Sequence, residues 1–95
     1  MSGKIRWGIM GLGGIAKKFA SDLSFVENGE LIAVGSRNID KAKSFASEFS
    51  VPHVYGSYES LVQDKNIDVI YIATPHSHHH ENTILCLNND KAVLC

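Results

Sequence analysis

Apolar and polar residues follow two alternating periods along the chain. Short, nearly continuous apolar runs, which are typical of strands buried on both faces of a parallel sheet, alternate with segments whose apolar residues recur at helical spacing. Asn38 and Ser57 stand where N-caps of two helices are expected, and Pro52 prevents a helix from continuing past it. The pattern predicts strands at residues 4–10, 30–36, 53–56, 68–75 and 92–95, and helices at 13–29, 38–49, 57–62 and 78–89.

This alternation predicts an α/β fold with a Rossmann-type doubly wound parallel sheet, because strands joined through helices by short connections form right-handed βαβ units. In the last predicted helix we expect Ile84 and Leu87 to face the core. The fifth strand ends at the final residue, with no helix after it to cover the sheet. We therefore expect residues 1–95 to be one domain that is truncated after the fifth strand, a fragment of a larger enzyme.

The first strand and the first helix meet in a glycine-rich loop that matches the GxGxxA pattern of dinucleotide-binding folds. There the first glycine permits a tight turn, the second lets the backbone approach a pyrophosphate, and the alanine allows close packing of helix on strand. Amides at the helix N-terminus would point at the anion, helped by the helix dipole. A glycine turn needed only for packing and a methyltransferase-like loop are the alternatives. The loop residues are Gly11, Leu12, Gly13, Gly14, Ile15 and Ala16.

The end of the second strand favours NADP over NAD. Folds that bind NAD carry an acidic residue for the ribose hydroxyls about 20 residues after the glycine loop, but this chain has Ser36 and Arg37 there. A hydroxyl and a guanidinium suit a 2′-phosphate, because arginine donates paired, charge-assisted hydrogen bonds. Lys41 would add a second positive charge to the same pocket, unless it and Arg37 are only solvated surface charges. The missing acid also counts against a methyltransferase.

Four histidines follow the fourth predicted strand, in the segment ATPHSHHHE, at the sheet edge where open α/β folds bind ligands. A metal site is the alternative, but adjacent histidines on a helix point in different directions, whereas zinc needs converging ligands. We expect no metal, and a histidine that lines the nicotinamide end of a cofactor or donates a hydrogen bond to substrate. The histidines are His76, His78, His79 and His80.

Composition and charge have the ordinary values of one soluble globular domain. With a net charge of −1 and scattered lysines and arginines, we expect no nucleic-acid partner. The apolar opening is too short for a membrane span and lacks a signal-peptide cleavage pattern, so we expect no membrane partner. Cys86 and Cys95 lack the spacing of a disulfide framework and predict reduced thiols and a cytoplasmic location.

Together these segments resemble the N-terminal domain of the glucose–fructose oxidoreductase, inositol dehydrogenase and MocA family, and within it the dihydrodiol dehydrogenase-like members. The sequences GIMGLGGIAKKFA, AVGSRNIDKAKSFA, YGSYESLV, IDVIYIATPHSHHHE and AVLC stand in the order and spacing of that family, over essentially the whole chain. The resemblance implies an NAD(P)-dependent oxidoreductase that acts on sugars, polyols, diols or related carbonyl compounds. It also implies a homo-oligomer for the full-length protein.

The resemblance further implies which residues of the fourth strand's loop lie near the cofactor. Thr74 and Pro75 match the family's Thr-Pro pair, which lies beside the cofactor, and Ala73 precedes them. His79 matches a histidine of the family, and His76 stands where relatives commonly have asparagine. By similarity to members with a Ser-Arg pair after the second strand, the cofactor is expected to be NADP.

The chain stops just before the position of the family's Glu-Lys-Pro motif, whose lysine helps to polarise or protonate the reacting oxygen. It also lacks the C-terminal α/β domain that shapes the substrate pocket. We therefore expect the 95 residues to bind cofactor without catalysis, and hydride transfer only in the parent protein. A noncatalytic NAD(P) sensor or regulator, and a structural domain without ligand, are the alternatives.

Overall fold

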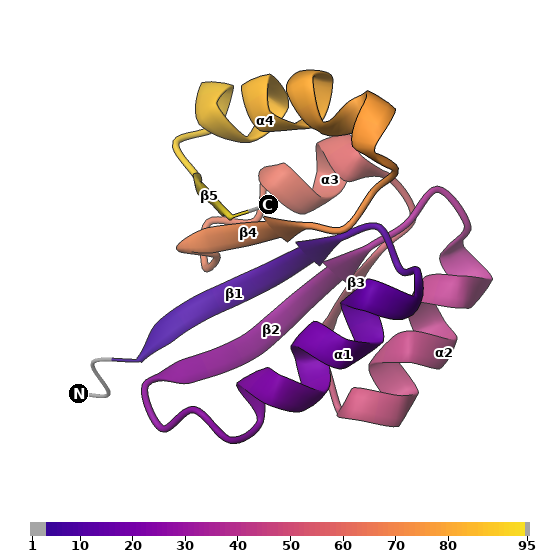
Figure 1. Ribbon diagram of the computed structural model, residues 1–95, viewed down its shortest axis with the longest axis vertical. Coiled ribbons are helices and arrows are strands. Elements are labelled where there is room, and N and C mark those ends of the chain that lie inside the picture. Colours follow the sequence, from indigo (N-terminus) through magenta and orange to yellow (C-terminus); the bar gives the residue numbers. More distant parts are fainter. Residues whose placement is uncertain (1–3, 95) are drawn as a thin grey trace.

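Five parallel strands form the centre of the structure, in the order β3-β2-β1-β4-β5, with helices on both faces of the sheet (Figure 1). This computed structural model describes residues 4–94 and every side chain among them except that of His76. The arrangement confirms the predicted Rossmann-type doubly wound sheet. The elements are β1 (Ile5–Met10), α1 (Gly14–Leu23), β2 (Gly29–Gly35), α2 (Ile39–Phe49), β3 (His53–Tyr55), α3 (Tyr58–Val62), β4 (Val69–Ile72), η1 (His76–His78), α4 (His79–Asn88) and β5 (Ala92–Leu94).

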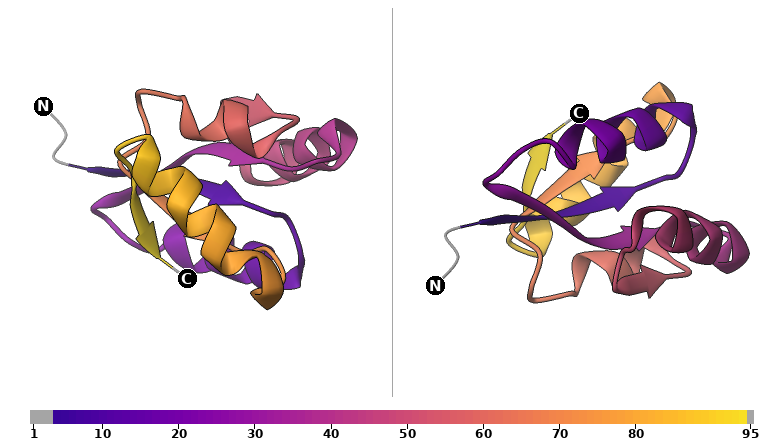
Figure 2. Two further views of the ribbon diagram at one scale, coloured as in Figure 1. Left: turned by 90° about the horizontal axis from the view of Figure 1, so that it is seen from above. Right: turned by 90° about the horizontal axis from the view of Figure 1, so that it is seen from below.

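Each face of the sheet packs on its own apolar core, because successive side chains of a strand point to opposite faces. In β1, Ile9 belongs to the core shared with α1 and α2, and its neighbour Met10 belongs to the core shared with α3 and α4. In Figure 1, α3 and α4 lie above the sheet and α1 and α2 below it, and the view from above shows α4 lying across β4 and β5 (Figure 2). Burial on both faces explains the nearly continuous apolar runs of the central strands.

The first helix is shorter than its apolar pattern predicts. α1 ends at Leu23, and the chain then forms turns in which the Val26 N–H donates to the Leu23 carbonyl at 3.0 Å. This tighter pairing lets the chain reverse and enter β2 at Gly29. Phe25 is 85% exposed, so the apolar residues after Leu23 do not continue the buried stripe.

The inward face of α4 differs from the predicted one. Ile84 and Leu87 are 45% and 58% exposed, so the prediction that they face the core is wrong. The buried residues are Asn82 and Cys86. Asn82 is turned inward by a hydrogen bond to Thr74, and a hydrophobic pattern cannot reveal a face on which one residue is polar. Cys86 lies in the core as a thiol, whereas the second cysteine is outside the described residues.

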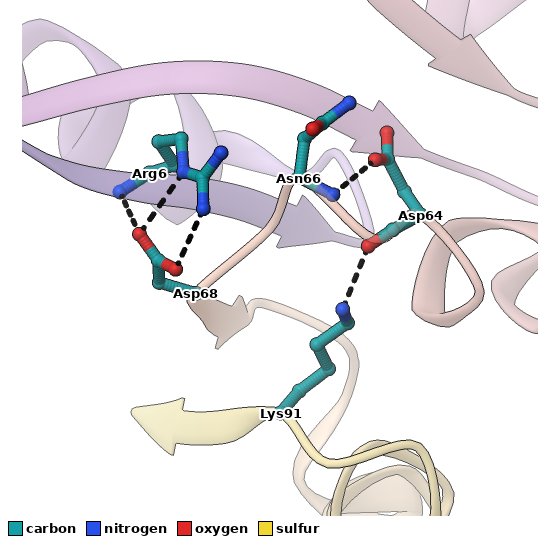
Figure 3. Close-up of polar contacts among 5 residues, drawn as sticks. All are labelled: Arg6, Asp64, Asn66, Asp68 and Lys91. Carbon is teal, nitrogen blue, oxygen red and sulfur yellow. Dashed lines mark hydrogen bonds and ion pairs between the residues drawn. The ribbon is translucent and has the colours of Figure 1, made fainter.

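The turn between α3 and β4 lies at the amino end of β4, opposite the glycine loop. Hydrogen bonds join it to Arg6 of β1 and to Lys91, the residue before β5 (Figure 3). Asp68 accepts hydrogen bonds from the Arg6 backbone N–H at 2.9 Å and from the Arg6 guanidinium at 3.2 and 3.3 Å. Lys91 Nζ donates to the Asp64 carbonyl at 2.7 Å, and the Asn66 N–H donates to Asp64 Oδ1 at 2.8 Å. The polar residues of this turn therefore have a structural role, because their hydrogen bonds hold the turn against β1 and the start of β5.

Candidate functional site

The carboxyl ends of β2, β1 and β4 lie side by side, at the edge where open α/β sheets bind ligands. The Gly11 N–H donates to the Gly35 carbonyl at 3.0 Å, and the Ala73 N–H donates to the Met10 carbonyl at 2.8 Å. These bonds extend the pairing just past the strands, so the loops that follow start from one ordered edge. The motifs that begin at Gly11, Ser36 and Ala73 therefore occupy adjacent strand ends.

Gly11 turns the chain sharply out of β1. Its φ of +89° lies in a region that residues with side chains rarely adopt. A Cβ at this position would lie 2.9 Å from Thr74 Cγ2 and 3.1 Å from the Ala73 carbonyl carbon. The tight turn expected from the sequence is present, and it packs directly against the loop after β4.

α1 begins with its N-terminal amides open to solvent. Gly13 is the N-cap, no side chain of the described residues caps the helix, and its first turn carries no acidic residue. A Cβ built on Gly13 or Gly14 would meet no atom within 4 Å. Ile15 is exposed, whereas Ala16 is fully buried against the sheet, as the GxGxxA pattern requires. The loop is therefore a cradle of backbone N–H groups that an anion can enter.

The residues after β2 form a hydrogen-bonded turn into α2. Ser36 is buried, and its Oγ accepts a hydrogen bond from the Asn38 N–H at 3.1 Å. Asn38 Oδ1 in turn accepts from the Asp40 N–H at 3.0 Å and the Lys41 N–H at 3.3 Å, which confirms the predicted N-cap. The sequence thus specifies this turn locally, and the turn presents the residue between Ser36 and Asn38 to solvent.

Arg37 and Lys41 have different neighbours. The exposed Arg37 guanidinium lies 5.3 Å from the centre of the Tyr58 ring in α3, a cation–π contact that orients it. Sequence reasoning missed this contact, because nothing local connects the two residues. Lys41 lines a cavity of about 370 Å³ between α1 and α2, together with Lys17 and the half-buried Leu12 of the glycine loop. A joint phosphate pocket of Arg37 and Lys41 stays a prediction.

Thr74, in the loop after β4, is buried and is held by two side chains of α4. Asn82 Nδ2 donates to Thr74 Oγ1 at 2.6 Å, and His79 Nε2 donates to the Thr74 carbonyl at 2.9 Å. Pro75, the next residue, is exposed. Sequence reasoning identified His79 but missed Asn82, whose one signal was its spacing of four residues from Cys86 on the same helix face.

The histidines at the start of α4 do not converge on one point. His78 Nδ1 lies 3.6 Å from Glu81 Oε1, His79 bonds a carbonyl of the β4 loop, and His80 is exposed. The predicted contact of the His76 side chain lies outside the described side chains. Among the described residues, no group of three histidine, cysteine or carboxylate side chains is arranged to hold a metal ion.

A second polar cluster joins β3 to the end of α3. The Asp64 side chain is only 4% exposed, and its Oδ2 accepts from the Tyr55 hydroxyl at 2.7 Å and lies 2.7 Å from His53 Nδ1. Burial raises the pKa of Asp64, but hydrogen bonds from Tyr55, the Asn66 N–H and His53 outweigh burial and hold that pKa below its ordinary value. Burial and the bond to Asp64 raise the pKa of Tyr55 to about 12. The cluster is a structural link between the two elements.

Comparison with known proteins finds relatives over nearly the whole chain. Trans-1,2-dihydrobenzene-1,2-diol dehydrogenase of Mus musculus is 45% identical over 93 residues, which are 96% of this chain and 28% of the relative. The structure of scyllo-inositol dehydrogenase from Lactobacillus casei, with bound NAD(H) and scyllo-inositol, matches with a TM-score of 0.85 at 27% identity, over 95% of this chain and 27% of that one. The 3-ketoreductase KijD10 from Actinomadura kijaniata, in complex with TDP-benzene and NADP, gives a TM-score of 0.91 at 29% identity, over 96% and 29%.

The chain spans about 28% of the length of the curated relatives it matches. None of the helices within residues 4–94 combines the length and the apolar character that a membrane crossing requires. The profile of the GFO/IDH/MocA family, an oxidoreductase family with an NAD-binding Rossmann fold, matches residues 5–95. With this match, and with motifs in the order and spacing that the sequence predicted, the chain belongs to the GFO/IDH/MocA oxidoreductase family.

Proposed function

We propose that this chain is the NADP-binding domain of an oxidoreductase that transfers hydride between a nicotinamide and a sugar, polyol, diol or related carbonyl compound. Membership of an NAD(P)-binding family and the names of its relatives support the reaction and substrate class. The observation that carries the proposal is the open start of α1, where a Cβ on Gly13 or Gly14 would meet nothing within 4 Å, while Gly11 is packed against the β4 loop.

The glycine loop fits a pyrophosphate. Since none of the side chains that the structure describes caps α1 and its first turn carries no acid, the first amide N–H groups of α1 remain available as donors, and the helix dipole favours negative charge there. We expect the N–H groups of Gly13, Gly14 and Ile15 to bind the phosphates, with Leu12 and Ala16 shaping the loop around them. When bound, the nicotinamide supplies the hydride chemistry, and the protein positions it.

Ser36 and Arg37 are the proposed ligands of a 2′-phosphate. The Ser36 hydroxyl accepts from the Asn38 N–H, so its own proton remains to be donated to a phosphate oxygen. The exposed Arg37 guanidinium, oriented by Tyr58, offers the forked donors that suit phosphate. Lys41, in the first turn of α2, adds positive charge nearby. These residue types support NADP over NAD.

The segment after β4 is proposed to line the nicotinamide half of the cofactor. Ala73, Thr74 and Pro75 follow β4 at the strand end next to the glycine loop, and the rigid attachment of Thr74 to α4 supports this role. His79 would act by holding the loop through its bond to the Thr74 carbonyl. His76 is proposed as a cofactor neighbour by its position in the same segment.

We propose no catalytic residue within this chain. Since the chain spans about 28% of the length of its relatives, the acid–base group and the substrate pocket are proposed to lie elsewhere in a longer protein, a cytoplasmic homo-oligomer. The chain by itself is then expected to bind cofactor without turnover.

Titration of the chain with NADPH and NADH side by side, by calorimetry at fixed low salt, tests the proposal. We expect NADPH to bind more tightly. Arg37→Ala should weaken NADPH binding by about 1.5–3 kcal/mol, the range for hydrogen bonds to charged groups, and leave NADH binding nearly unchanged.

Lys65→Ala is the matched control, because it removes an exposed positive charge from the turn at the opposite sheet edge. It should change the affinity for neither cofactor. Equal losses of NADPH and NADH affinity in Arg37→Ala would contradict the 2′-phosphate role. Binding of neither cofactor by the unaltered chain would contradict the cofactor site itself.

A further inference from the structure

Thr74 is fixed on two sides, by α4 and by the glycine turn. Its hydroxyl oxygen accepts the 2.6 Å bond from Asn82, its carbonyl accepts the 2.9 Å bond from His79, and its methyl group lies against the Gly11 turn. Asn82 is buried, with only 6% of its surface exposed. The hydrogen bond from the buried Asn82 amide, together with the contact of the methyl group with Gly11, fixes the orientation of the Thr74 side chain.

The direction of this hydrogen bond matters chemically. The Asn82 amide nitrogen donates and the Thr74 oxygen accepts, so the bond does not consume the hydroxyl proton of Thr74. Thr74 therefore remains able to donate. An aspartate at position 82 would have nearly the same shape but, as a carboxylate, could only accept, and the hydroxyl proton of Thr74 would turn toward it.

The sheet order shows which half of a dinucleotide this hydroxyl would meet. β2 and β4 flank β1 on opposite sides, and the glycine loop follows β1. A dinucleotide whose pyrophosphate lies at the start of α1 extends its two halves over the two flanking strand ends. With the 2′-phosphate at Ser36 and Arg37 beyond β2, the nicotinamide half lies beyond β4, at Thr74.

We propose that Asn82 is a positioning residue that orients the Thr74 hydroxyl to donate a hydrogen bond to a polar group of the nicotinamide half. This inference rests on the proposed NADP function. It assigns a ligand-related role to a residue of α4 that lies outside every sequence motif of the chain, acting only through Thr74.

The test compares two ligands, NADPH and 2′,5′-ADP, which contains the adenosine half alone. Asn82→Asp should weaken NADPH binding about 5- to 10-fold, the effect of losing one neutral hydrogen bond, and leave 2′,5′-ADP binding unchanged. The nicotinamide fluorescence of bound NADPH should also change. Asn89→Asp is the matched control, because Asn89 is the C-cap of the same helix and its side chain bonds only locally, to the Leu85 carbonyl at 2.9 Å, among the contacts described.

A second variant, Thr74→Val, removes the hydroxyl but keeps the branched shape against Gly11, so it carries the test if Asn82→Asp fails to fold. The same loss for NADPH alone is expected. Equal losses for both ligands, or a loss for neither, would overturn the positioning role and leave Asn82 as a structural residue. If the unaltered chain binds 2′,5′-ADP and NADPH equally weakly or not at all, the proposed function fails first, and this inference falls with it.

Discussion

Gly11 and Gly13 lie in one loop but lack side chains for different reasons. Gly11 has a φ of +89° and no room for a Cβ beside Thr74, so the fold itself requires glycine there. At Gly13 a Cβ would meet nothing within 4 Å, so the protein's own packing leaves that space open. Of the glycines in the GxGxxA pattern, the first is explained by the structure alone, and for the second we propose the approach of a ligand as the reason.

Substitutions should distinguish the structural role of Gly11 from the proposed ligand-binding role of Gly13. Gly11→Ala should lower the free energy of unfolding by about 2–4 kcal/mol, because it combines left-handed strain with a close contact to Thr74. Gly13→Val should cost at most about 1 kcal/mol as a poorer N-cap, yet weaken NADPH and NADH binding alike by about tenfold or more. Urea unfolding and calorimetry measure both effects. Unchanged cofactor affinity in Gly13→Val would mean that the loop has only a structural role.

At the scale of the elements, the helices differ in how their N-termini are satisfied. The Asn38 side chain caps α2, and Ser57 Oγ accepts from the Ser60 N–H at 3.1 Å to cap α3. α1 begins after Gly13, where no side chain within the described part of the chain caps it and its first turn carries no acid. Side chains therefore cap α2 and α3, whereas neither α1, which starts from the glycine loop, nor α4 has a side-chain cap among the described residues.

The N-cap of α2 should contribute measurably to the free energy of unfolding. Asn38→Ala should lower the free energy of unfolding by about 1 kcal/mol, because the N–H groups of Asp40 and Lys41 lose their acceptor. Urea denaturation monitored by circular dichroism measures this loss. Asn88→Ala, at an exposed position in the last turn of α4, serves as the control and should change stability by less than about 0.5 kcal/mol. Equal effects of the two substitutions would argue against the cap.

At the scale of the whole molecule, the turn between α3 and β4 connects elements that are distant in sequence. Asp64 bonds Tyr55 of β3 through its side chain and Lys91, just before β5, through its carbonyl, while Asp68 bonds Arg6 of β1. This turn therefore links β1, β3 and the start of β5 to the strand that it begins. A change in the protonation of a residue in this turn, or of its partners, should therefore change the free energy of unfolding of the whole molecule.

Tyr55 should make the protein less stable at alkaline pH. Burial and its bond to Asp64 raise the pKa of Tyr55 from 10.0 to about 12. Because the folded-state pKa is the higher one, this contribution is fully present below about pH 10 and is lost as the pH rises toward about 12. Between about pH 9 and 11, Tyr55→Phe should therefore lose about 1 kcal/mol less free energy of unfolding than the unaltered chain, as measured by urea denaturation at the two pH values. An equally steep alkaline decline in Tyr55→Phe would refute this source of the pH dependence.

Local patterns predicted the order of strands and helices and the turns that begin them. The caps at Asn38 and Ser57 and the turn at Gly11 follow from a few neighbouring residues, so they were readable from the chain. The end of α1 and the buried face of α4 could not be predicted from the chain. Apolar residues after Leu23 continue the helical period without a core to receive them, and the inward residue of α4 is the polar Asn82.

The sequence by itself determined the fold class and the location of the glycine loop, because period, capping and turn chemistry act over a few residues, and the family followed from the resemblance of its motifs. Only the tertiary structure decided which side chains meet across the elements: Arg37 over Tyr58, Asn82 on Thr74, and Asp64 on Tyr55. Contacts of this kind depend on how packed helices are placed on the sheet, and a polar residue buried for one hydrogen bond leaves no hydrophobic signal in the chain.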